Sequence, residues 1–337
     1  MLLLSVGTGL LGLLVSMLTN EQQATIGNGL TVHNPVLVGA LTYNLIPKPY
    51  DPFDPFPLFL IFLGTVFSVY LARSIGNGRF PCLTWPVVVV EFLLLFVLTL
   101  NDHSPKVNSA ISTRNLTDNA TSDATMEYAS HIVENGTVVN LNWGMVLQGA
   151  VTSASQVFAL NDVAAGSVIY LALLIYSPAM AALSFIGASA GCLLGLLLGV
   201  PQQTVYDGIW GFNGVLTGSA MGGTFLVLNR QTVVATLIAV LFCPVLQFVL
   251  APIAAKWGLP VLAAPFVLTV WLFLGLRESP GHTFPRPECM SFPEKQRYEF
   301  LKTRRALRSN RAEGSGEPET PTREEKRPSS TSCDLCT

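Results

Sequence analysis

Long apolar runs separated by short polar connections fill most of the chain. Each run approaches the ~20 residues that a helix needs to cross a bilayer. The runs lie at Met1–Thr19, Phe56–Ala72, Trp85–Leu100, Trp143–Leu160, Gly166–Phe185, Gly187–Val200, Val233–Pro252 and Leu259–Leu276. Because a backbone in lipid must satisfy its hydrogen bonds internally, runs of this kind predict helices. The pattern therefore indicates an all-α integral membrane protein.

Two shorter apolar stretches are interrupted by glycine, asparagine and, in the first, proline. They read GLTVHNPVLVGALTY at Gly29–Tyr43 and GIWGFNGVLTGSAMGG at Gly208–Gly223. Interrupted segments at matching places in two halves of a chain are typical of substrate sites built from half-membrane helices. We expect both stretches to border a site near the middle of the membrane.

The interrupted stretches belong to an internal repeat with a step of 179 positions, as from Gly29 to Gly208. The same step pairs Asn34 with Asn213, and the two prolines of FPCLTWPV (Phe80–Val87) with those of LPVLAAPF (Leu259–Phe266). Shared apolar composition does not by itself pair asparagine and proline, so we interpret the repeat as real. Trp143–Phe185 has almost no counterpart after Met1, so we expect the first repeat to lack its N-terminal part.

These features divide the chain into a first membrane repeat (1–100), a loop (101–142), a second membrane repeat (143–276) and a tail (277–337). The loop contains all three N-x-S/T sequons, at Asn115, Asn119 and Asn135, which predicts a glycosylated extracellular segment. The tail contains twelve of the 19 Lys and Arg residues, which predicts a cytoplasmic and largely disordered segment. With loop and tail on opposite sides, the two repeats have inverted topologies and enclose a central pore.

Composition narrows the function. The chain is 50% hydrophobic and 12% charged, against about 25% charged in soluble domains. It has no HExxH, GxSxG or P-loop motif and no basic surface interleaved with aromatic residues, so we predict no enzyme activity, no cofactor, no metal and no nucleic-acid partner. Charges are also sparse in the apolar runs, which disfavours ion-coupled transport. A passive route for a small neutral solute fits best.

Five polar residues in the membrane repeats are candidates for the site. Asn34 and Asn213 either cap helices or contact the solute, and Thr84 begins a tilted, proline-initiated helix. Glu91 follows Thr84 by seven residues and shares its helix face, so it is either a pore-facing ionisable group or a neutral, hydrogen-bonded side chain. Gln156 either pairs with a polar solute or forms an interhelical hydrogen bond.

Several motifs together resemble the urea transporters. These are the doubled FPCLTWPV and LPVLAAPF, KWGLPV, WGFNGVLTGSAMGG and SQVFALND, and the likeness covers about Gly7–Phe266 apart from the sequon loop. The resemblance implies a multi-pass protein of the plasma membrane that forms a homotrimer in the lipid bilayer, with one pore per subunit. It also implies channel-like movement of urea down its concentration gradient, without energy coupling.

The resemblance also implies which residues line the pore. In that family urea lies flat between apolar and aromatic side chains while oxygen atoms accept its N–H groups. The positions carried over are His33, Asn34, Leu37, Thr84, Gln156, Phe158, Phe212, Asn213, Leu216 and Ala263.

Three positions depart from the family pattern. Ala263 stands in place of the family's second pore threonine, Val87 in place of a phenylalanine, and Asp162 where the family usually has proline. Two alternatives therefore stay open: a related pore with altered selectivity for water, ammonia or another amide, and, given the incomplete first repeat, a non-conducting regulatory subunit.

Overall fold

The computed structural model describes residues 1–21, 26–27, 29–47, 50–76, 81–103, 141–275, 284–285, 287 and 291–313. Within these residues the chain is helical with no strand, which confirms the predicted all-α class. In the same part of the chain, three helices are long and apolar enough to cross a membrane: Pro55–Ile75, Pro178–Leu197 and Arg230–Ala255. The sequon residues Asn115, Asn119 and Asn135 lie outside the described residues.

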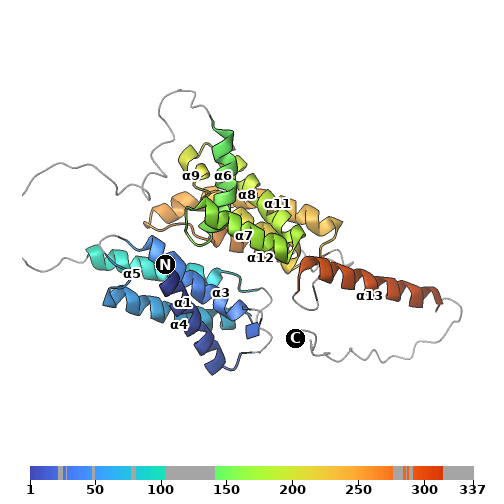
Figure 1. Ribbon diagram of the computed structural model, residues 1–337, viewed down its shortest axis with the longest axis horizontal. Coiled ribbons are helices and arrows are strands. Elements are labelled where there is room, and N and C mark those ends of the chain that lie inside the picture. Colours follow the sequence, from blue (N-terminus) through green and yellow to red (C-terminus); the bar gives the residue numbers. More distant parts are fainter. Residues whose placement is uncertain are drawn as a thin grey trace, which may run out of the picture.

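The first half of the chain packs around one helix. It comprises α1 (Leu2–Leu18), α3 (Leu30–Leu45), α4 (Pro55–Gly76) and α5 (Trp85–His103), drawn in blue and cyan in Figure 1. Helix α3 contacts the other three. The shared core is aliphatic and includes Leu37, Val38, Ile61 and Leu98. α3 therefore anchors this half while part of its surface stays available to the second half.

The second half is organised in the same way around a short helix, α10. Its elements are α6 (Trp143–Gln156), α7 (Val163–Tyr176), α8 (Pro178–Leu197), α9 (Gln202–Tyr206), α10 (Phe212–Ser219), the π-helical turn η1 (Ala220–Thr224), α11 (Arg230–Ala255) and α12 (Ala264–Gly275). Helix α10 contacts α6, α8, α11 and α12. A further helix, α13 (Pro293–Glu313), extends away from this half in Figure 1 and was not predicted from the sequence.

Two predicted boundaries differ from the structure. The runs Gly166–Phe185 and Gly187–Val200 are divided at Ser177 instead of near Ile186, because the Ser177 side chain accepts a hydrogen bond from the Met180 N–H (3.1 Å) and Pro178 is the first residue of α8. The predicted break in Gly29–Tyr43 is absent, since α3 continues through Pro35. The Pro35 ring packs where a Cβ on Gly12 of α1 would lie, so contact between the helices favours this path.

The local backbone conformation recurs with the same step as the sequence. Left-handed φ angles occur at Gly29 and Gly208 (70° and 79°) and at Leu83 and Leu262 (50° in both). Leucine rarely adopts such an angle, so its occurrence at both paired positions supports a structural relation between the two halves. Close contacts recur too. A Cβ on Gly39 would meet the Leu4 carbonyl oxygen, and a Cβ on Gly218 would meet the Leu183 carbonyl oxygen.

Candidate functional site

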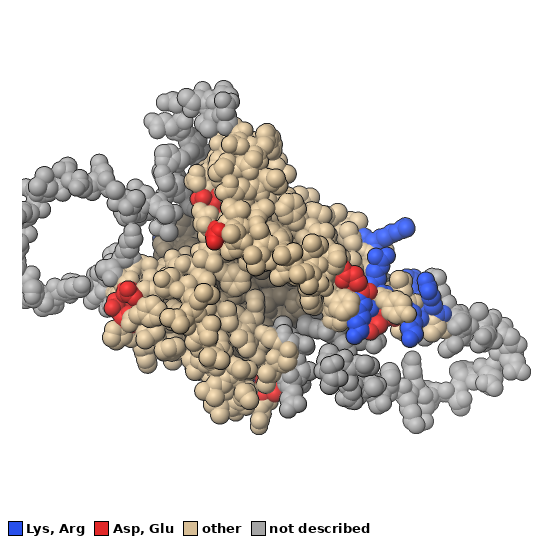
Figure 2. Space-filling view, viewed as in Figure 1, with Lys and Arg blue, Asp and Glu red and all other residues tan. Residues whose placement is uncertain are grey.

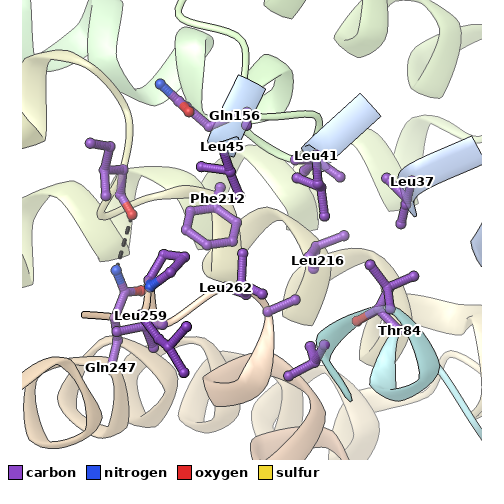
Figure 3. A pocket seen from close by; sticks show the side chains of 18 of the residues that line it. Leu37, Leu41, Leu45, Thr84, Gln156, Phe212, Leu216, Gln247, Leu259 and Leu262 are labelled. Carbon is purple, nitrogen blue, oxygen red and sulfur yellow. Dashed lines mark hydrogen bonds between the residues drawn. The ribbon is translucent and has the colours of Figure 1, made fainter. Parts of the chain in front are cut away.

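A cavity of about 300 Å³ lies between the two halves. Its walls come from α3, from the start of α5, and from the second half. Figure 3 shows Leu37, Leu41 and Leu45 of α3 along one wall, with Phe212 and Leu216 of α10 between Thr84 and Gln247. The remaining lining residues are Val87, Val88, Gln156, Val157, Ala159, Ile209, Ala251, Ala255, Leu259, Pro260, Val261, Leu262 and Ala263.

The cavity is mostly apolar, and its polar side chains are Thr84, Gln156 and Gln247. Thr84 is 3% exposed, and its hydroxyl has no hydrogen-bond partner among the described residues. Gln156 donates from Nε2 to the Asp207 carbonyl oxygen (2.8 Å), which fixes the amide at the end of α6. A hydroxyl that bonds none of the described residues is available to a solute inside the cavity.

Gln247 was not predicted as a site residue. Its Nε2 donates to the Ile209 carbonyl oxygen (3.0 Å), and its Oε1 accepts from Asn213 Nδ2 (3.0 Å). Asn213 also donates to the carbonyl oxygen of Leu262 (3.2 Å), where the backbone is left-handed. An amide inside the apolar run Val233–Pro252 is costly in a membrane unless it is hydrogen-bonded. The presence of Gln247 in this run was therefore the sequence feature that could have indicated a buried polar contact there.

The hydrogen bonds of Asn213 show that its side chain bridges elements and does not cap a helix. It lies inside α10, whose N-cap is Gly211, and it does not cap the helix. Instead, it joins α10 to α11 and to the loop before α12. One face of the cavity is thus held by side-chain amides that bond buried carbonyl oxygens.

Six of the ten predicted pore residues line this cavity: Leu37, Thr84, Gln156, Phe212, Leu216 and Ala263. The other four lie elsewhere. His33 is exposed on α3, and Asn34 is buried with no partner for Oδ1 among the described residues. Phe158 packs against the core of the first half, and Asn213 is completely buried behind the cavity wall.

Glu91 is completely buried in α5 and does not line the cavity. Thr42 Oγ1 on α3 lies 2.8 Å from Glu91 Oε1 and 2.8 Å from the Val38 carbonyl oxygen. A hydroxyl has one hydrogen to donate, so both contacts are complete hydrogen bonds only when Glu91 carries a proton and donates to Thr42. The pair joins the two helices that form the Leu37 and Thr84 walls.

The segment that carries Thr84 is also tied to the second half. Trp271 Nε1 of α12 donates to the Pro81 carbonyl oxygen (2.9 Å). The rings of Trp85 and Trp271 lie 5.5 Å apart between centroids. These contacts attach the segment around Thr84 to α12, so residues of both halves line the cavity.

The cavity is lined by uncharged side chains. Among the lining residues there is no Asp, Glu, Lys, Arg or His. Within the described part of the chain no three His, Cys, Asp or Glu residues are grouped as a metal site. The arrangement offers apolar and aromatic surfaces, one hydroxyl and two amides, which can bind a small neutral molecule but supplies no general acid or base.

Comparison with known proteins agrees with this geometry. The family described as "Urea transporter" matches residues 1–278. The goat (Capra hircus) protein named "Urea transporter 1" is 28% identical over 302 residues, covering 88% of this chain and 74% of the goat protein. The mouse (Mus musculus) protein of that name is 28% identical over 176 residues, covering 50% of this chain and 46% of its own. This chain of 337 residues therefore belongs to the urea transporter family, a family of membrane transporters rather than enzymes.

Proposed function

We propose that this chain provides a passive, channel-like route for urea across a membrane, with the cavity between its halves as the narrow part. The observation that carries the proposal is the pairing of apolar and aromatic walls with a few polar groups. Phe212 and the leucines of α3 supply the walls, and Thr84 supplies a hydroxyl that bonds no described residue.

The chemistry of urea suits this lining. The molecule is planar, has four N–H donors and one carbonyl acceptor, and loses its water shell in a narrow site. Apolar and aromatic surfaces accommodate its two faces, while the Thr84 oxygen accepts an N–H at its edge. Hydrogen bonds formed in the cavity replace those with water, and a small number of them keeps binding weak enough for release.

The absence of an ionisable side chain among the described lining residues supports a passive mechanism. Ion-coupled carriers place carboxylates or a cation site beside the substrate. Downhill movement needs neither.

A second candidate is a related pore with altered selectivity for water, ammonia or another small amide. It is favoured by Ala263, which lines the cavity where the family pattern has a threonine. The missing hydroxyl removes about 0.5–1.5 kcal/mol of stabilisation from a hydrogen-bonding solute. A smaller solute that makes fewer hydrogen bonds loses less.

The proposal includes a finer architecture. The paired left-handed residues support two structural repeats, which we propose have inverted topologies around half-membrane helices near α3 and α10. The homotrimer, the plasma-membrane location, the cytoplasmic tail and the glycosylated extracellular loop remain predictions that rest on the sequence and the family resemblance.

The test is stopped-flow measurement of urea entry into vesicles that contain the purified full chain. Empty vesicles and a water-permeability measurement on the same samples are the controls. Saturable urea flux above the empty vesicles supports the proposal. Flux of water or ammonia without urea would favour the second candidate, and no solute flux from folded protein would favour a regulatory subunit.

A further inference from the structure

Helix α13 begins against the end of a helix long and apolar enough to cross the membrane. Glu294 Oε1 accepts hydrogen bonds from the Ser177 hydroxyl (2.9 Å) and from the Ala179 N–H (3.1 Å), at the first turn of α8. Pro293 packs against Gly223 of η1. Because α8 has the length and composition of a membrane span, we expect its first turn to lie at the boundary between lipid and water.

The first turn of α13 is held on more than one side, since Glu294 bonds α8 and Gln296 is 4% exposed, so the face of the rest of the helix is judged from its exposed residues. Residues 294, 298, 301 and 305 follow the spacing i, i+4, i+7, i+11 and form one stripe along the helix. The stripe continues from Glu294 through Tyr298 and Leu301, which are 68% and 39% exposed, to Arg305. Two large apolar side chains on an exposed helix thus point the same way as the carboxylate that bonds α8.

Basic residues flank this stripe on both sides. Lys295 and Lys302 lie along one edge, and Arg297 and Arg304 lie along the other, each pair seven residues apart; all four are exposed. Figure 2 shows Lys and Arg gathered at this end of the molecule, while the rest of the visible described surface carries few charges. Apolar residues bordered by long basic side chains are typical of helices that lie in a membrane interface, where Lys and Arg reach the phosphates.

We propose that α13 lies along the membrane surface and binds anionic lipid headgroups through its basic edges, with Tyr298 and Leu301 in the interface. The lipid partner follows from charge complementarity and from the continuity of this face with the membrane-spanning surface at α8. The inference is independent of what the cavity conducts.

The experiment measures amide hydrogen exchange of the full chain in lipid nanodiscs. One set contains phosphatidylcholine alone and the other contains phosphatidylcholine with phosphatidylserine. We expect exchange over residues 295–306 to be at least about fivefold slower in the anionic discs, the effect of a single basic side chain near such a surface. The protection must decrease as salt is raised, because surface charges are screened.

Charge reversal provides the matched comparison. Lys302→Glu on one basic edge should lose most of the lipid-dependent protection, whereas Lys256→Glu, the same change at an exposed site after α11, should keep it. Equal exchange in the two kinds of disc would overturn the proposal. Equal protection by free glycerol phosphate in neutral discs would also overturn it, because the site would then bind soluble anions instead of a lipid surface.

Discussion

Replacement of Thr84 by valine should lower urea transport without lowering the stability of the protein. Valine has nearly the same shape as threonine and lacks only the hydroxyl. That hydroxyl lines the cavity, is buried, and has no hydrogen-bond partner among the described residues. The substitution therefore removes a contact for the solute without removing one within the described protein.

The magnitudes follow from these contacts. Loss of one neutral hydrogen bond to the solute costs about 0.5–1.5 kcal/mol, which corresponds to a two- to tenfold decrease in urea flux. Exchange of the hydroxyl for a methyl group buries one more apolar carbon, worth about 0.8 kcal/mol. The free energy of unfolding should therefore stay the same or rise by about 1 kcal/mol.

The assay combines urea flux into vesicles with thermal unfolding of the same preparations. Thr236→Val is the control. Thr236 is completely buried in α11, does not line the cavity, and donates to the Thr232 carbonyl oxygen (2.7 Å). Its replacement should lower the unfolding temperature slightly and leave flux unchanged.

Two results would refute the role of Thr84. Unchanged flux in Thr84→Val would mean that the hydroxyl does not contact the solute. Flux and unfolding temperature that fall together, as in a general packing defect, would mean that Thr84 acts through the fold.

Three further predictions concern packing and protonation. Gly218→Ala places a Cβ against the Leu183 carbonyl oxygen and should lower the free energy of unfolding by about 1–3 kcal/mol. Gly7→Ala in α1 places a Cβ with nothing within 4 Å and should raise the free energy of unfolding by up to about 1 kcal/mol. Chemical denaturation of the purified variants measures both changes. Burial acts to raise the pKa of Glu294, but hydrogen bonds from the Ala179 N–H, its own N–H and the Ser177 hydroxyl outweigh it and lower that pKa below the usual 4.5. The ionised form is therefore stabilised by folding, so the difference in unfolding temperature between the wild type and Glu294→Gln should be present at about pH 6 and decrease as the pH falls through the lowered pKa. A difference that does not change with pH would contradict this. Because the Thr42 hydroxyl has one hydrogen and two neighbours at 2.8 Å, infrared spectra at neutral pH should contain a protonated-carboxyl band that Glu91→Gln removes, and its absence from the wild type would show that Glu91 is ionised.

Much of the fold could be predicted because lipid restricts the backbone so strongly. Apolar length alone places helices close to the observed α1, α4, α5, α11 and α12. The division at Ser177 was harder, since the hydrophobic pattern is continuous there and only a capping serine and a proline mark it. Continuation of α3 through Pro35 depends on contact with Gly12, far away in sequence, so local preference gave the wrong answer.

The candidate site was recoverable where the repeat or the family motif pointed to it, as at Thr84, Phe212 and Ala263. Gln247 was not predicted as a site residue because the equivalent position in the first repeat is Ser68, so the repeat gave no matching glutamine. Asn213 was predicted to cap a helix or contact the solute, and only the three-dimensional contacts reveal that it bonds Gln247 and Leu262. Sequence identifies costly polar residues more readily than it identifies their partners.

The unequal lining of the cavity has a kinetic consequence for the proposed route. The first half contributes leucines, valines and one hydroxyl, while both glutamines come from the second half. Such asymmetry cannot drive net movement in one direction, because a passive carrier or channel obeys detailed balance at equal concentrations. It can make the half-saturating urea concentration differ between the two faces, provided that the maximal rates differ by the same factor. Influx and efflux measured separately should therefore give different saturation curves with the same ratio of maximal rate to half-saturating concentration.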